Sequence, residues 1–175
     1  MSNGIIKVDE VITTQAESEI KVGGIDSKYD VYMLQVSGIT TVSGATIGLT
    51  RVTTNGTAQT GTNYDLAGLG LRTDQAYTHL TNLNYTEWGY LGAWSHQGSN
   101  SSFRGNFTAY LFNFNNANQY SMITAKSISR WANGTLAPIT TGVYKVAEIN
   151  DGISYTLQSD IQTGARISLY GLTNS

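Results

Sequence analysis

Two histidines, one of them beside a serine, are the first residues of this chain whose types could support chemistry. His79 and His96 lie seventeen residues apart, and neither has a partner at metal-ligand spacing. Zinc needs three or four nitrogen or sulfur ligands, and the chain has no cysteine, so a structural zinc site is not expected. Ser95 directly precedes His96, but consecutive strand residues point to opposite faces and cannot form a catalytic pair by adjacency. A Gly-x-Ser-x-Gly motif is absent from the sequence, and hydrolase chemistry has no support.

The carboxylates are spread over many predicted strands and turns. A glycosidase needs two carboxyl groups about 5 to 10 Å apart, and no pair is singled out by spacing among Asp65, Asp74, Glu87, Glu148, Asp151 and Asp160. The segment Asn150-Asp151-Gly152 lacks the acidic spacing of a calcium loop and is better explained as a turn. We therefore expect a protein that is not an enzyme and holds no cofactor or metal.

Aromatic residues between positions 85 and 114 are the most unusual feature of the sequence: Tyr85, Trp88, Tyr90, Trp94, Phe103, Phe107, Tyr110, Phe112 and Phe114. Exposed tyrosines and tryptophans stack on sugars and anchor protein interfaces, whereas buried ones build a core. Alternation along 107–112 leaves apolar side chains on both faces of a strand. We expect the outer set, Tyr110, Phe112 and Phe114, to be covered by another subunit.

Apolar and polar residues alternate with a period of two in much of the chain, which predicts that β-strands position these side chains. Strand-like segments occur at 4–12, 29–36, 45–54, 64–72, 85–94, 103–114, 119–131, 143–149, 153–157 and 165–170. Asn55-Gly56 and Asn150-Asp151-Gly152 have the composition of tight turns. The pattern predicts an all-β, antiparallel, jelly-roll-like β-sandwich with about eight main strands.

Three stretches interrupt this pattern. Residues 37–44 read as a glycine-bounded connection, and residues 73–84 lack a clear period, so they are expected to be a loop or one helical turn. Asn133-Gly134 with Pro138 indicates a break before the strand at 143–149.

The first 28 residues form a segment that we interpret as an N-terminal arm, followed by the sandwich at 29–175. A Gly23-Gly24 break and a polar composition separate the arm from the dense strand signals that begin at Tyr29. The arm could be a strap that docks onto a neighbouring subunit, or an ordinary first strand. The sequence leaves both interpretations open.

Charge and composition narrow the possible partners. Charged residues make up 13% of the 175 residues, the formal net charge is -2, and lysine and arginine are not clustered. A nucleic-acid partner is therefore not expected. The sequence has no signal-peptide pattern and no run of 18 apolar residues, so we expect no secretion signal and no membrane span.

Three segments resemble a group of bacteriophage virion proteins whose chains end in a strand followed by Leu-Tyr-Gly-Ile/Leu. These are Tyr29-Asp30-Val31-Tyr32, Phe103-Arg104-Gly105-Asn106-Phe107 and Gly164-Ala165-Arg166-Ile167-Ser168-Leu169-Tyr170-Gly171-Leu172. The resemblance implies a non-enzymatic β-sandwich or jelly-roll module on the outside of a particle, often trimeric. Such a module serves as a capsid decoration (cement) protein or as a tail-fibre tip.

The resemblance leads to two functional hypotheses. In the first, the chain is made in the host cytoplasm and binds the major capsid protein on the outer surface of the virion as a homotrimer. Fibre-type members usually carry a long anchoring region before the module, and here about 28 residues precede it, which favours this hypothesis. Its expected contacts are the arm residues Ile5, Ile6, Val8, Val11 and Ile12 and the aromatic residues Tyr110, Phe112 and Tyr170. In the second, a tail-fibre or spike module has other virion proteins or a host glycan as partners, and it binds the glycan through Trp88, Tyr90 and Trp94.

Overall fold

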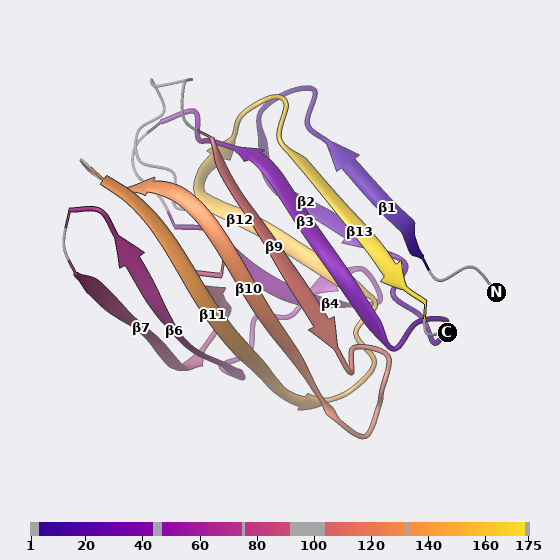
Figure 1. The fold of residues 1–175 in the computed structure, drawn as a ribbon. Coiled ribbons are helices and arrows are strands. Elements are labelled where there is room, and N and C mark those ends of the chain that lie inside the picture. The colour runs from indigo at the N-terminus through magenta and orange to yellow at the C-terminus, as the bar shows by residue number, and fades with distance from the viewer. Residues whose placement is uncertain (1–3, 44–46, 75, 92–103, 132–133, 174–175) are drawn as a thin grey trace.

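Two antiparallel β-sheets pack against each other in the computed structural model of this chain (Figure 1). The structure describes residues 4–43, 47–74, 76–91, 104–131 and 134–173. All secondary-structure elements assigned within these ranges are β-strands. The antiparallel β-sandwich that the sequence predicts is therefore confirmed.

The larger sheet has eight strands and faces the viewer in Figure 1. In spatial order they are β1 (Ile5–Ile12), β13 (Arg166–Leu172), β3 (Val31–Ile39), β9 (Gly105–Phe112), β10 (Tyr120–Trp131), β11 (Gly134–Ala147), β6 (Tyr64–Arg72) and β7 (Tyr77–Tyr85). Strands β1 and β7 are the two edges.

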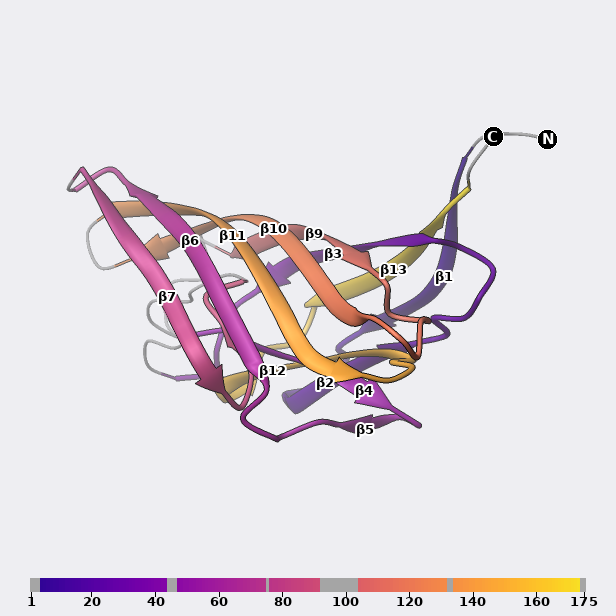
Figure 2. The ribbon, with the colours of Figure 1, turned by 90° about the horizontal axis from the view of Figure 1, so that it is seen from below.

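The smaller sheet lies behind the larger one and forms the lower layer in Figure 2. Its strands are β2 (Glu17–Gly23), β12 (Gly152–Ile161), β4 (Leu49–Thr54) and β5 (Thr57–Ala58), and β8 (Trp88–Gly89) pairs with β4. The two C-terminal strands, β12 and β13, belong to different sheets, so the chain crosses between the layers at its end as it does several times earlier.

The core lies between the sheets, because every second residue of each strand points to the inner face of its sheet. In β9, Phe107, Ala109 and Leu111 are buried, whereas Tyr110 between them is exposed. Phe107 meets Tyr155 of β12 with ring centroids 5.6 Å apart. Contacts of this kind across the two layers remove apolar surface from water and hold the sheets together.

The hairpin turn predicted at Asn55-Gly56 joins β4 to β5. Both residues have positive φ, 51° and 71°, which suits the tight turns that match the twist of antiparallel strands. The predicted turn at 150–152 joins β11 to β12.

Residues 73–84 correct the sequence interpretation, because most of them form the edge strand β7. Both faces of this strand mix apolar and polar residues, with Tyr77, His79 and Leu83 outward and Leu80 and Asn82 inward. The mixture hides the period of two. Pairing with β6 along seven residue pairs imposes the strand in spite of the weak local signal.

The prediction of strand breaks at 37–44 and at Pro138 is also wrong in part. Strand β3 continues to Ile39, and Pro138 lies inside β11, which runs from Gly134 to Ala147 without interruption. Proline cannot donate a backbone hydrogen bond. The β10–β11 register accordingly skips from Lys126↔Ile139 to Ser129↔Leu136, leaving Pro138 outside the paired positions on that side.

The first 28 residues contribute one edge strand to each sheet. Strand β1 pairs with β13 and strand β2 pairs with β12. The backbone N–H of Thr13, between them, donates to the Ala165 carbonyl at 2.9 Å. The segment expected to be an arm is thus hydrogen-bonded into the sandwich, while its contact with another subunit stays a prediction.

Candidate docking surface

The outer face of the larger sheet carries most of the exposed apolar side chains of the described chain. We define the apolar row as the outward residues that lie side by side on six neighbouring strands: Ile5, Leu172, Val31, Phe112, Met122 and Val143. These side chains come from sequence positions as distant as 5 and 172. Only the strand register brings them together.

A second row runs parallel to the apolar row across all eight strands. It consists of Lys7, Tyr170, Met33, Tyr110, Thr124, Thr141, Ala67 and Thr81. Tyr110, Phe112 and Tyr170, the aromatic residues predicted from the sequence to make contacts, therefore share one face. Tyr110 is 42% exposed, and the other two are half-buried.

Phe114, which we expected in the same outer set, is buried. Strand β9 ends at Phe112, so the alternation of faces does not extend to Phe114.

The charges on this outer face lie outside β3 and β9, on flanking strands that include β10 with Lys126 and Arg130. The outward residues of β3 and β9 are uncharged: Val31, Met33, Gln35, Ser37, Asn106, Thr108, Tyr110 and Phe112. Toward β6, Lys145 Nζ lies 2.8 Å from Asp65 Oδ1, and on β1, Lys7 Nζ lies 3.1 Å from Glu10 Oε1. An uncharged strip over β3 and β9 with charged groups on both sides, Lys126 among them, combines apolar contact area with polar surroundings, as protein-binding surfaces do.

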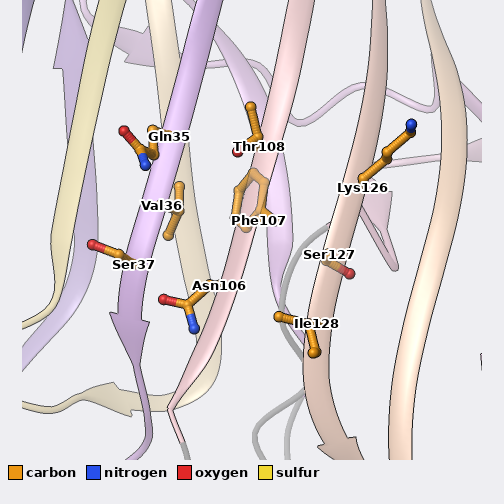
Figure 3. Close-up of a pocket in the computed structure, with 9 residues that line it drawn as sticks. All are labelled: Gln35, Val36, Ser37, Asn106, Phe107, Thr108, Lys126, Ser127 and Ile128. Carbon is orange, nitrogen blue, oxygen red and sulfur yellow. The ribbon is translucent and has the colours of Figure 1, made fainter.

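Shallow hollows mark the same face. Figure 3 shows one of about 470 Å³ over β3, β9 and β10, where Gln35 and Lys126 lie on either side of Thr108. Its lining consists of Gln35, Val36, Ser37, Asn106, Phe107, Thr108, Lys126, Ser127 and Ile128. Two further hollows lie beside Tyr110 and Ile139 and beside Leu83 and Tyr85. Amides, hydroxyls and one ammonium group line the hollow in Figure 3, which suits contacts with a partner's side chains.

The carboxylates considered at first are mostly engaged in the fold. Hydrogen bonding from Lys145 lowers the pKa of Asp65, and hydrogen bonding from Arg72 lowers the pKa of Asp74. Glu87 pairs with Arg51 at 2.7 Å. Glu148 accepts hydrogen bonds from Tyr144 and Thr54, and Asp151 accepts them from Thr53 and the Gly56 amide. The contacts of Asp65, Glu87 and Asp151 join segments distant in sequence, whereas the Arg72–Asp74 pair is local.

His79 lies on the exposed side of β7, where its ring meets Tyr77 edge-on at 5.5 Å. Ser95 and His96 lie outside the described residues. Among the described residues, no group of three histidine, cysteine or acidic side chains is close enough to hold a metal ion.

The arm residues divide into two sets. Ile5, Ile6 and Ile12 are exposed, whereas Val8 and Val11 are partly buried and pack against the core. Only the exposed isoleucines are available to a partner in this structure.

The assignment of Trp88 to glycan binding is corrected by its burial. The Trp88 side chain is fully buried, its Nε1 donates to the Val143 carbonyl at 3.2 Å, and its ring meets Tyr64 edge-on at 5.1 Å. A ring with no free face cannot stack on a sugar. Tyr90 is partly buried against the core, and Trp94 lies outside the described residues.

Sequence reasoning missed Tyr77 and Leu83, and it named Tyr85 in the aromatic cluster without giving it a contact. All three are exposed on β7, at 56%, 70% and 50%. Their even spacing of six and two residues was the available signal, but the mixed composition of the intervening residues hid it.

Comparisons with protein-family models, curated proteins and solved structures find no match to this chain. The described residues contain no helix long and apolar enough to cross a membrane.

Proposed function

We propose that this chain is a non-enzymatic phage virion structural protein that decorates the capsid. In this proposal it binds the lattice of the major capsid protein through the outer face of its larger sheet and stabilises the head. The phage assignment rests on the resemblance of the segments around 29–32, 103–107 and 164–172. The outward-facing apolar row beside Tyr110 and Tyr170 is the structural observation that supports docking; Ile5 and Met122 in it are exposed and the other four residues are half-buried.

The segment that carries the resemblance lies on the proposed surface. Strand β13 contains the Leu-Tyr-Gly-Leu sequence, and Tyr170 and Leu172 point outward while Leu169 is buried. The strand thus serves the core with one set of side chains and the outer face with the other.

Binding would stabilise the shell by mass action. A ligand that binds the assembled lattice but not free subunits favours the assembled state. Burial of the apolar row supplies the driving force at about 25 cal/mol for each Å² of apolar surface removed from water. Strands β3 and β9 present no charge outward, so their burial carries no cost of desolvating an ion. A partner that also covers β10 must pair the exposed Lys126 or leave it in solvent.

The first test measures where the protein lies and in how many copies. Particles of the phage that encodes this chain are purified, and its copy number is determined by quantitative mass spectrometry with immunogold labelling. Hundreds of copies on the head are expected. A few copies at the tail would contradict the decoration proposal and support the tail-fibre hypothesis instead.

The second test uses Tyr110→Lys, which places a charge at the centre of the face. Because aromatic anchors dominate interface energies, we expect the variant's binding to particles that lack the protein to weaken by about 2 kcal/mol, roughly thirtyfold. The matched control is Ser18→Lys, an exposed position on β2 of the other sheet, which should bind normally. Equal binding by both variants would contradict docking through the outer face.

The contribution of the arm to particle binding is tested by substitutions in place of a deletion. Deletion of residues 1–24 would remove β1 and β2 and expose the backbone of β13 and β12. Replacing Ile5, Ile6 and Ile12 with serine leaves both strands in place and removes only exposed apolar surface. Unchanged particle binding by this triple variant would rule out the docking role of the arm.

A further inference from the structure

The two edges of the larger sheet differ in how they are protected against pairing with another strand. Exposed edges are usually blocked by charges, proline or β-bulges. Strand β1 has such features: Lys7, Asp9 and Glu10, and a register shift between Lys7 and Asp9. Strand β7, at the opposite edge, has a register shift only near its end, between the pairs Leu66↔Asn82 and Tyr64↔Tyr85. It reads YTHLTNLNY and contains no lysine, arginine, acidic residue or proline.

The free backbone groups of β7 can be identified from the hydrogen bonds of its neighbour β6. The Lys145 amide donates to the Asn63 carbonyl at 2.8 Å, and the Thr73 amide donates to the Thr135 carbonyl at 3.1 Å. Residues 65, 67, 69 and 71 fall in the same register and therefore direct their peptide groups toward β11. The even-numbered residues of β6 direct theirs toward β7.

It follows that Thr78, Leu80 and Asn82 of β7 use their peptide groups in the ladder with β6. The peptide groups of Tyr77, His79, Thr81 and Leu83 point away from the sheet. Among the described residues, no strand pairs with this side of β7. These four residues, each two positions from the next, thus offer a backbone N–H donor and a backbone carbonyl acceptor. They lie at an edge whose side chains are largely exposed.

We propose that β7 pairs with β7 of a second copy of this chain, antiparallel and centred on Thr81. The sequence of the strand is self-complementary in this register. Thr81 faces Thr81, and His79 faces Leu83. Tyr85 lies beyond the register shift of β7 and is not part of the paired segment. Threonine pairs are favourable directly across antiparallel strands.

The absence of charge favours a second copy over a charged partner strand. An isologous contact repeats each residue across a two-fold axis, so any charged residue at its centre would face itself. Strand β7 has none, whereas β1 carries three charges. The pairing would join the two larger sheets into one continuous sheet, with the two outer faces on the same side because the axis is perpendicular to the sheet. The inference does not depend on the proposed function.

Sedimentation equilibrium of the full chain, over a micromolar to millimolar concentration series, tests the association. A monomer–dimer equilibrium is expected. Residue-resolved amide exchange tests the geometry: the amides of Tyr77, His79, Thr81 and Leu83 should become protected as concentration rises, while those of Leu80 and Asn82 are protected throughout. A monomer at all concentrations, a trimer, or a dimer without protection of the four amides would each overturn the proposal.

Charge substitutions at the axis provide a sharper test. Thr81→Lys and Thr81→Glu each place like charges opposite each other, and each should raise the dimer dissociation constant about tenfold. Mixing the two variants places lysine opposite glutamate and should restore dimers. The control, Thr124→Lys, is exposed on β10 at the centre of the same face and should dimerise normally. Failure of the mixture to recover, or loss of dimers in the control, would refute pairing through β7.

Discussion

The Trp88 indole connects the two sheets at the level of single residues. Trp88 belongs to β8, which pairs with β4 of the smaller sheet, while its Nε1 donates to Val143 of β11 in the larger one. A Cβ atom added at Gly142 would lie 2.6 Å from this Nε1, so the indole packs directly on the backbone of β11. Trp88, which we assigned to glycan stacking from the sequence, is therefore part of the core.

Replacing Trp88 with alanine should therefore lower the free energy of unfolding by about 3–5 kcal/mol, because a large cavity forms between the sheets. Trp88→Phe should cost less, since most of the apolar volume remains while the hydrogen bond to Val143 is lost. Urea denaturation followed by circular dichroism measures both. A change below about 1 kcal/mol for Trp88→Ala would mean that the side chain is exposed in solution.

Gly171 gives the Leu-Tyr-Gly-Leu segment a structural explanation. The Tyr29 ring lies over its backbone so closely that a Cβ atom at position 171 would come within 2.1 Å of the ring. Tyr29 is itself buried and meets Tyr32 edge-on at 5.5 Å. The glycine thus allows an aromatic ring to cover β13 from the inner side while Tyr170 faces outward.

At the scale of elements, the turn between β11 and β12 links both sheets through Asn150, which is fully buried. Its Oδ1 accepts a hydrogen bond from Ser121 Oγ of β10 at 2.8 Å, and its Nδ2 donates to Thr54 Oγ1 of β4 at 3.1 Å. Its backbone N–H donates to the Phe114 carbonyl at 2.7 Å. The turn therefore contacts two strands, β10 and β4, and the loop that holds Phe114.

We expect Asn150→Ala to destabilise the protein by about 1–3 kcal/mol, because the buried Ser121 hydroxyl loses its acceptor. Asn118→Ala, in the exposed turn before β10, is the matched control and should change stability by less than about 0.5 kcal/mol. Thermal and urea denaturation measure both variants. Similar losses at the two positions would show that the Asn150 contacts contribute nothing specific.

At the scale of the whole molecule, ionisable groups limit stability at both ends of the pH range. Hydrogen bonding from Lys145 lowers the pKa of Asp65, and the Lys28 amide and Tyr32 hydroxyl lower the pKa of Asp26. Burial raises the pKa of Tyr32 to about 12, and burial also raises the pKa of Tyr64 and Tyr155.

The signs of these shifts predict a stability plateau. A carboxyl group with a lowered pKa stabilises the fold above its unfolded pKa of about 4, and this contribution is lost as the pH falls through the folded value. A phenol with a raised pKa stabilises the fold below its unfolded pKa of about 10, and this contribution is lost as the pH rises through the folded value. Urea midpoints should be constant near neutrality and should fall at both ends.

Tyr155→Phe separates the alkaline effect from general denaturation. The Tyr155 hydroxyl is buried and has no hydrogen-bond partner among the described residues. Its removal should leave stability at neutral pH equal or higher and should reduce the alkaline loss. Unchanged alkaline behaviour in this variant would assign the loss to the other tyrosines. Stability that is highest below about pH 4 would contradict the acid part of the prediction.

The sequence alone determined the fold class and much of the local structure. Alternation of apolar and polar residues is a property of the chain itself, so it correctly predicted strands such as β9, with Phe107 inward and Tyr110 outward. The turn at Asn55-Gly56 was predictable for the same reason, since positive φ is a local requirement. The phage assignment and the docking role remain predictions that the experiments above address.

The tertiary structure decided which strands are neighbours, and with them the candidate surface. Ile5 and Leu172 meet in the apolar row only through the register of β1 with β13, and local alternation contains no information about register between distant segments. Trp88 is buried because β11 lies above it, and residues 77–85 are a strand because β6 pairs with them. These outcomes depend on contacts between residues far apart in the chain, and a short sequence window cannot encode them.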